Sequence, residues 1–211
     1  MHFKVLFMEE ANYVKQLTEI RTMMDRSSRF VSLSGLSGVL AGIYSVIGAF
    51  GVKYTMVHFR PVYADLSNTG FRIILSIAFA VMGLSFLTAV ILSVYKAGKR
   101  GEKTWNSAAR RLIINFCIPM IAGGVVCLSM IQHSLYGLIA PFTLIFYGLA
   151  LLNASKYTLE TVRYLGLFFL VLGLISTQFL GKGLLFWTIG FGGFHIFYGT
   201  FMYFKFDRQA K

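Results

Sequence analysis

The chain has 211 residues, of which 56% are hydrophobic and only 13% are charged, whereas an ordinary soluble domain has roughly 25% charged residues. A soluble protein of this size has too little interior to bury that much apolar surface, so the composition excludes a soluble domain and predicts a membrane protein. The formal net charge of +12 would suggest nucleic acid as a partner in a soluble protein, but here the lysines and arginines lie between long apolar runs, which indicates membrane topology and no nucleic-acid partner.

Residues 1–29 are predicted to form a cytoplasmic amphipathic leader helix. Tyr13, Leu17, Ile20 and Met24 are spaced four, three and four residues apart, which places them on one stripe of a helix. The charges on the other faces have mixed sign, whereas a helix that lies on a membrane surface usually has a polybasic face. We therefore expect this helix to pack on the cytoplasmic side of the bundle or against another copy in a homo-oligomer. The alternative is a solvated lead-in helix.

Six apolar runs follow within a transmembrane domain predicted over residues 30–204. Each run is long enough to cross about 30 Å of hydrocarbon. The predicted spans are residues 30–51, 73–95, 112–132, 136–153, 164–180 and 184–204. Residues 205–211 are predicted to form a short cytoplasmic tail. The expected fold class is an all-α, polytopic bundle of six transmembrane helices.

The cations are distributed unequally between the two sides of this arrangement. Counted along the six spans, 16 of the 20 lysines and arginines fall on the side that holds both chain ends. Short loops rich in lysine and arginine stay in the cytoplasm. The sequence therefore predicts that the N-terminus and the C-terminus are both cytoplasmic.

The loop between the second and third spans is the most basic segment. Its six cations are Lys96, Lys99, Arg100, Lys103, Arg110 and Arg111. Such a cluster beside a membrane span is typical of sites that bind anionic lipid headgroups. The need to set the topology explains the same cluster equally well.

Ionisable residues are nearly absent from the predicted spans. No aspartate or glutamate lies within them, which argues against proton-coupled transport and against hydrolase or metalloenzyme chemistry, because these need buried acids or ligand clusters. The sequence predicts no metal site, no cofactor and no catalytic residue. His195, in the sixth span beside Gly192 and Gly193, is the clear ionisable exception. It is either a neutral histidine hydrogen-bonded to a neighbouring helix, a ligand or gating residue near the midplane, or a haem ligand.

A short repeat places two tyrosines at comparable positions. The tetrapeptide at residues 145–148 recurs at residues 196–199, so that Tyr147 and Tyr198 each precede a glycine. We include both tyrosines in the candidate midplane site with His195. The repeat suggests that the third and fourth spans, and the fifth and sixth, are copies of one hairpin. Chance in an aromatic-rich sequence is the alternative.

Small residues and a proline mark two further features. Ser34, Gly38 and Gly42 follow the spacing of small residues that lets helices approach closely, within this bundle or across a homo-oligomer. The third span contains a candidate hinge. It consists of Pro119, Gly123 and Gly124. Proline removes a backbone hydrogen bond inside a helix and causes a kink, which is either static or part of a binding site.

The sequence RFVSLSGLSG at residues 29–38, followed by AGIY at residues 41–44, resembles the first span of a group of uncharacterised bacterial six-helix integral membrane proteins. The resemblance covers the end of the leader helix and the first span. It implies the bacterial inner (cytoplasmic) membrane and no known activity.

Three classes of function are compatible with these features. The first hypothesis is a small transporter or channel component for a neutral or weakly polar solute, with His195 as a midplane site and Pro119 as a hinge. The second is a non-transporting regulatory or scaffold protein that binds a cytoplasmic partner. The third is a membrane enzyme or haem protein.

Overall fold

The computed structural model describes residues 33–59, 61–62, 65–99, 101 and 105–207, without the side chain of Phe206. The predicted leader helix lies outside the described residues. So do two of the cations of the basic loop, Arg100 and Lys103. The expectations about these segments stay predictions.

All the regular structure within the described ranges is helical. The α-helices are α2 (Gly35–Phe59), α3 (Thr69–Lys99), α4 (Ser107–Gln132), α5 (Ile139–Ala154), α6 (Thr161–Ser176), α7 (Gly183–Trp187) and α8 (His195–Met202). The 3-10 turns η1 (Tyr136–Leu138) and η2 (Ser155–Tyr157) flank α5, while the π-helical segments η3 (Thr188–Phe194) and η4 (Tyr203–Asp207) flank α8.

Five continuous helical stretches of the described chain are long and apolar enough to cross a membrane. They are Gly35–Phe59, Thr69–Lys99, Ser107–Gln132, Tyr136–Tyr157 and Gly183–Lys205. The remaining predicted span corresponds to α6, which has 16 residues and is about 24 Å long at 1.5 Å per residue, short of the usual hydrocarbon thickness. The prediction of an all-α, multi-pass membrane protein is confirmed, whereas a full complement of six spans stays a prediction.

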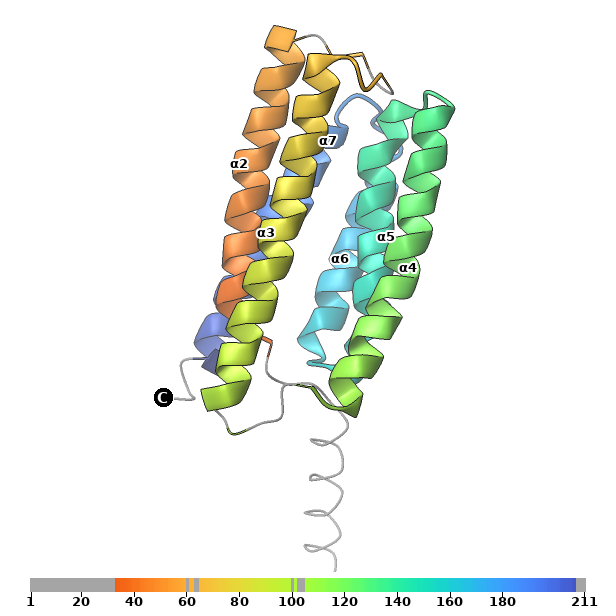
Figure 1. Cartoon of the computed structure of the whole chain (residues 1–211). Coiled ribbons are helices and arrows are strands. Elements are labelled where there is room, and N and C mark those ends of the chain that lie inside the picture. The colour runs from red at the N-terminus through yellow and green to blue at the C-terminus, as the bar shows by residue number, and fades with distance from the viewer. Residues whose placement is uncertain (1–32, 60, 63–64, 100, 102–104, 208–211) are drawn as a thin grey trace, which may run out of the picture.

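The helices form two lobes joined by the C-terminal segment (Figure 1). In one lobe α3 packs along α2, and in the other α5 lies between α4 and α6. The C-terminal segment, from α7 to α8, packs against α2 on one side and against α5 and α6 on the other. The last segment of the chain therefore holds the two lobes together.

The contact between α2 and α8 depends on small residues. A side chain at Gly199 of α8 would lie 2.5 Å from the backbone nitrogen of Val39 and 2.6 Å from the carbonyl oxygen of Gly35. A side chain at Gly38 would lie 3.1 Å from the α-carbon of Gly199. Because lipid is as apolar as the helix surfaces, such close van der Waals packing is a main source of helix association in a membrane.

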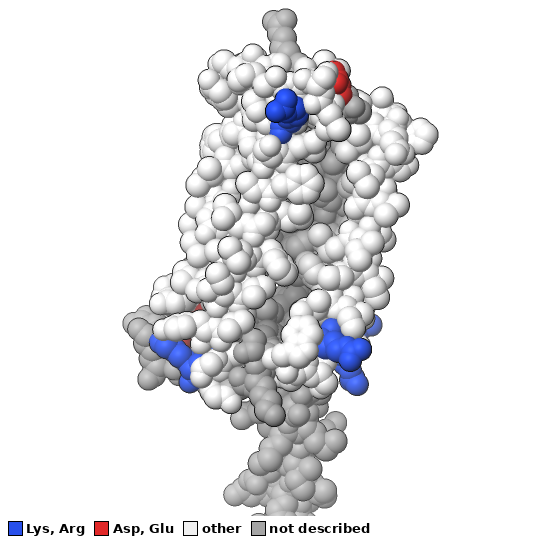
Figure 2. Space-filling view, in the orientation of Figure 1, with Lys and Arg blue, Asp and Glu red and all other residues white. Residues whose placement is uncertain are grey.

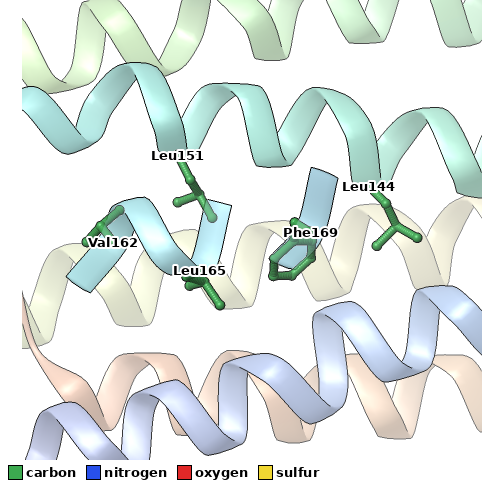
Figure 3. Packing of buried hydrophobic residues seen from close by; sticks show 5 residues of the cluster. All are labelled: Leu144, Leu151, Val162, Leu165 and Phe169. Atoms are coloured by element: carbon green, nitrogen blue, oxygen red, sulfur yellow. The ribbon is translucent and has the colours of Figure 1, made fainter. Parts of the chain in front are cut away.

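The buried apolar core lies in the second lobe, between α5 and α6. Figure 3 shows that Leu144 and Leu151 extend from α5 towards α6, which contributes the rest of the cluster. That cluster consists of Leu144, Leu151, Val162, Leu165 and Phe169. The backbones of the two helices meet at Gly148 and Gly166, where an added side chain on either residue would lie within 3.0 Å of backbone atoms of the other helix. Phe169 and Leu144 are completely buried, so the interior between these two helices is closed to solvent and lipid.

One carboxylate connects three segments at the end of the bundle where α2 begins. Asp207, the last residue of η4, accepts a hydrogen bond of 2.9 Å from the backbone nitrogen of Gly35. Its other oxygen lies 2.6 Å from Nζ of Lys96 in α3, and only 12% of each of these two side chains is exposed. Lys96 also donates a hydrogen bond of 2.6 Å to the carbonyl oxygen of Leu33. Asp207 thus satisfies a free N–H group at the start of α2 and connects α2, α3 and η4.

Two helix starts carry local side-chain caps. The side chain of Asn106 accepts a hydrogen bond of 2.8 Å from the backbone nitrogen of Ala109 at the start of α4. At the start of α3, the side chain of Asn68 accepts a hydrogen bond of 3.0 Å from the backbone nitrogen of Phe71. In the turn before this cap, Asp65 accepts hydrogen bonds from the hydroxyl and the backbone nitrogen of Ser67, at 2.7 and 2.8 Å. These bonds, the hydroxyl first, hold the pKa of the Asp65 carboxyl below its ordinary value. The chain is therefore held in defined turns before both helices.

The described cations gather at the two ends of the bundle, and the face seen in Figure 2 is uncharged between them. At the end where α3 finishes and α4 starts, they belong to Lys96, Lys99, Arg110, Arg111, Lys156, Arg163 and Lys205. At the opposite end they belong to Lys53, Arg72 and Lys182. We refer to the first of these as the cation-rich end.

Candidate functional site

The candidate site lies where the C-terminal segment changes its helical geometry. Residues Thr188–Phe194 form the π-helix η3, and His195 is the first residue of α8. π-Helical turns are rare and occur frequently at functional sites. His195 is therefore presented to the bundle interior at a point where the regular helical repeat is interrupted.

The imidazole of His195 is buried, with 8% of the residue exposed. Its Nε2 is 2.8 Å from the hydroxyl oxygen of Tyr147 in α5. The rings of Phe169 and Phe191 lie with their centroids 5.2 and 5.9 Å from the imidazole, and Phe191 is stacked nearly parallel to it. Tyr147 in turn contacts both of these rings and also Phe116 of α4. The histidine is thus enclosed by aromatic rings, and its one side-chain partner among the described residues comes from another helix.

The second nitrogen of His195 faces its own helix. The backbone carbonyls of Gly190 and Phe191 lie beside the ring, but Nδ1 forms no hydrogen bond of good geometry with any described residue. A neutral imidazole has one donor and one acceptor nitrogen. With the Tyr147 hydroxyl at Nε2, the pair needs no charge on either side chain, which suits a position inside a membrane.

The second tyrosine of the repeat has a different partner. The hydroxyl of Tyr198 is 3.1 Å from the hydroxyl of Thr161 at the start of α6, and Thr161 also contacts the sulfur of Met202 at 3.4 Å. The structure therefore brings Tyr147 to His195 and leaves Tyr198 in a separate polar contact one turn away. Both tyrosines still pack against the same apolar core.

The glycines proposed for this site face different directions. Gly192 is buried against α2, where an added side chain would lie 2.6 Å from a methyl group of Val46, whereas Gly193 faces open space. Neither contributes a polar group. Gly192 lets α2 and η3 approach closely, and the exposed Gly193 lies on the outer surface of the segment.

The residues proposed as a hinge lie in one continuous helix. Pro119 is inside α4, which runs without interruption from Ser107 to Gln132. Gly123 faces the ring of Phe146 in α5, and Gly124 faces open space. The structure thus uses Gly123 to seat α4 on α5. Movement about Pro119 stays a prediction.

The proposed packing residues of the first span lie at the start of α2. Gly38 and Gly42 face η3 and α8, and Gly42 would clash with Ile196 and the carbonyl oxygen of Gly192 if it carried a side chain. Ser34 precedes the helix and accepts a hydrogen bond at its carbonyl from Ser37. Within the described residues these glycines face segments of the same chain. The close helix contacts that they allow are therefore contacts within one bundle.

The described cations of the basic loop have different surroundings. Lys96 is held by Asp207, and the Nζ of Lys99 lies 4.9 Å above the ring of Tyr95. Arg110 and Arg111 are exposed at the start of α4. Three of the four described cations of this loop therefore have side chains that can reach a ligand at the membrane surface.

Sequence reasoning did not identify several partners of these residues. Phe169 and Phe191 enclose His195, Thr161 bonds Tyr198, and Asp207 pairs with Lys96. Phe191 lies four residues before His195 on the same segment, whereas the other partners come from different helices. Aromatic or hydroxyl residues in apolar runs carry no local pattern that indicates such a distant partner. One feature of the sequence could have drawn attention to Asp207, because it is the single acidic residue of the predicted tail.

Metal binding has no support in the described part of the chain. No group of three histidine, cysteine, aspartate or glutamate side chains there could hold a metal ion. Cys117 and Cys127 are both free and half-buried within α4. The site is thus a hydrogen-bonded tyrosine–histidine pair in an aromatic enclosure.

A family model described as "TMEM128 protein" matches residues 34–158, which is more than half of the chain. The chain belongs to the TMEM128 protein family. The matched region runs from the start of α2 past α5, so it contains Tyr147 and the cations that flank the α3–α4 connection, whereas His195 lies beyond it. No curated protein and no solved structure matched the chain.

Family membership and the apolar helices identify a multi-pass membrane protein of unknown activity. This agrees with the resemblance of the first span to uncharacterised multi-pass membrane proteins. The family match does not indicate a bacterial source, and the location in a bacterial inner membrane stays a prediction.

Proposed function

We propose that this protein is a non-transporting membrane scaffold whose cation-rich end faces the cytoplasm and binds anionic lipid headgroups. The observation that carries the proposal is the enclosure of His195. Its Nε2 is hydrogen-bonded to the hydroxyl group of Tyr147 at 2.8 Å. The rings of Phe169 and Phe191 cover the imidazole. A solute that crosses the bundle needs polar groups that are open to it, whereas Nε2 of His195 and the Tyr147 hydroxyl are already hydrogen-bonded to each other and covered by aromatic rings.

The charge distribution supports the proposed orientation. The cation-rich end carries seven described lysines and arginines, namely Lys96, Lys99, Arg110, Arg111, Lys156, Arg163 and Lys205, against three at the other end. Cytoplasmic loops carry the excess of such residues, and the cytoplasmic leaflet supplies the anionic lipids that attract them. We infer six membrane crossings, in which α6 and the turns beside it complete the fifth, because an even number of crossings is needed to bring Asp207 at the end of η4 next to Gly35 at the start of α2.

Thiol labelling tests both the closed interior and the orientation. In a variant without Cys117 and Cys127, the substitution His195→Cys is compared with Lys156→Cys and Lys182→Cys, which replace exposed residues at the two ends. A membrane-impermeant thiol reagent should label the Lys156 position only from the cytoplasmic side and the Lys182 position only from the opposite side. His195→Cys should react from neither side. Labelling of His195→Cys at a rate close to that of the end positions would overturn the closed interior.

Lipid binding is tested by stabilisation. A ligand that binds the folded state raises the melting temperature by mass action. Phosphatidylglycerol added to the detergent-solubilised protein should raise it more than phosphatidylcholine does, and salt should reduce the difference because exposed charges are screened. Equal stabilisation by both lipids would contradict the lipid-binding part of the proposal.

A transporter or channel component for a neutral or weakly polar solute is the second candidate. The observation that favours it is the position of His195 directly after the π-helix η3, since such segments often mark functional sites. In this alternative, the Tyr147–His195 hydrogen bond would open to admit the solute. The labelling experiment separates the two candidates, because only a transport path exposes position 195 to water.

A further inference from the structure

The face of the bundle between the two lobes is hollowed. Figure 2 shows a furrow that runs along this face, and Figure 1 places it between α3 on one side and α4 with α5 on the other. The furrow follows from the packing, because α3 is held by α2 and α4 is held by α5. The two outer helices therefore stand as walls that belong to different lobes.

The two helices that border the furrow carry exposed apolar side chains along their length and cations at the cation-rich end. Figure 2 shows basic side chains on both sides of the furrow at its lower, cation-rich end. In the chain, the last turns of α3 carry Lys96 and Lys99, and the first turns of α4 carry Arg110 and Arg111. Lys96 is neutralised by Asp207, which leaves Lys99 and the two arginines to act on a ligand. The charge at the mouth of the furrow is thus positive.

A furrow that is apolar along its length and positive at its mouth matches the chemistry of one molecule class. A phospholipid with an anionic headgroup has a negative end and an apolar chain. The half-thickness of a bilayer core, about 15 Å, corresponds to roughly ten residues of helix. In those ten residues α3 carries exposed Val90, Ile91 and Val94, and α4 carries exposed Ile113, Ile114 and Ile118.

We propose that the furrow holds one anionic phospholipid, with its phosphate between Lys99 and Arg110 and one acyl chain between α3 and α4. This inference rests on the proposed function, because it assigns a defined binding site to one of the lipids that the cation-rich end attracts. Bulk lipid is as apolar as the furrow walls, so the chain alone gives no preference. Selection comes from the two cations, and the furrow makes the bound lipid slow to exchange.

The experiment uses the full chain reconstituted in phosphatidylcholine vesicles with spin labels on the acyl chain of either phosphatidylglycerol or phosphatidylcholine. Electron paramagnetic resonance distinguishes a strongly immobilised chain from the mobile lipids around the protein. Both lipids should show the motionally restricted shell that surrounds any membrane protein, and phosphatidylglycerol should show an excess of about one strongly immobilised lipid per protein. Two exposed cations, each worth about 1 kcal/mol near a membrane surface, predict a preference for phosphatidylglycerol of roughly 30-fold.

Matched variants locate the site. The double substitution Lys99→Gln/Arg110→Gln should remove the preference, whereas Lys53→Gln/Arg72→Gln, which removes two exposed cations at the opposite end, should preserve it. Size-exclusion chromatography verifies that both variants remain folded.

The outcomes separate the two proposals. A preference for phosphatidylglycerol without a strongly immobilised chain would overturn the seat in the furrow and leave headgroup binding intact. The same preference in the Lys99→Gln/Arg110→Gln variant would overturn the assigned residues. The absence of any preference in the unmodified protein would overturn the seat together with the lipid-binding part of the proposed function.

Discussion

Substitution of Gly199 by alanine provides a direct measure of the contact between α2 and α8. The added methyl group would lie 2.5 Å from the backbone nitrogen of Val39, whereas ordinary contacts begin at 3.4 Å. The difference requires the two helices to separate locally by about 0.9 Å, and a gap of 0.5 to 1 Å forfeits a quarter to a half of the dispersion attraction between facing atoms. Because the neighbouring atoms are backbone atoms, a change of rotamer cannot relieve the clash.

The expected cost follows from two opposing terms. Overpacking costs about 1–3 kcal/mol, and the greater helix propensity of alanine returns up to about 1 kcal/mol. We expect a net destabilisation of about 1–2 kcal/mol, which for a chain of this length lowers the melting temperature by roughly 2–8 °C.

The assay is thermal unfolding in mild detergent at a fixed scan rate, followed by the fluorescence of the two tryptophans. The matched control is Gly193→Ala on the same segment, where nothing lies within 4 Å of an added side chain. The control should leave the melting temperature unchanged or slightly raised. An unchanged melting temperature for Gly199→Ala, or equal losses in both variants, would refute the packing argument.

Three further substitutions test contacts at other positions. Asp207→Asn should lower the free energy of unfolding by about 3 kcal/mol, because the largely buried ammonium group of Lys96 would lose its partner of opposite charge. A melting temperature within 2 °C of that of the unmodified protein would contradict this prediction. Asn106→Ala removes the cap of α4 and should cost about 1 kcal/mol in the same assay, whereas Asn106→Asp should cost much less. Tyr147→Phe should cost about 1 kcal/mol by leaving Nε2 of His195 without its partner, and adding His195→Leu should recover part of that loss if the hydrogen bond is its cause.

The sequence by itself determined the membrane environment and most of the helices. Apolar runs must form helices in lipid, because no water is present to satisfy the backbone groups. The turn predicted after the third span lies where α4 ends at Gln132 and where Ser134 adopts a positive φ of 61°. Helix ends were less certain, since α2 continues to Phe59 well beyond the apolar run that ends near residue 51. Hydropathy marks the extent of the hydrocarbon, whereas hydrogen bonding and capping decide where a helix stops.

Only the tertiary structure decided which residues meet. His195 was identifiable from the sequence because an ionisable group inside a span is rare, but its partner was not, since Tyr147 lies 48 residues away and bonds through a hydroxyl group at 2.8 Å. The repeated tetrapeptide placed Tyr147 and Tyr198 in similar local sequence, yet one bonds His195 and the other bonds Thr161. A local sequence pattern shows whether a segment lies in lipid or in water. Which side chains of different helices meet depends on how closely the glycines let the helix backbones approach. For the same reason the division into two lobes, and the furrow between them, became visible only in the packed helices.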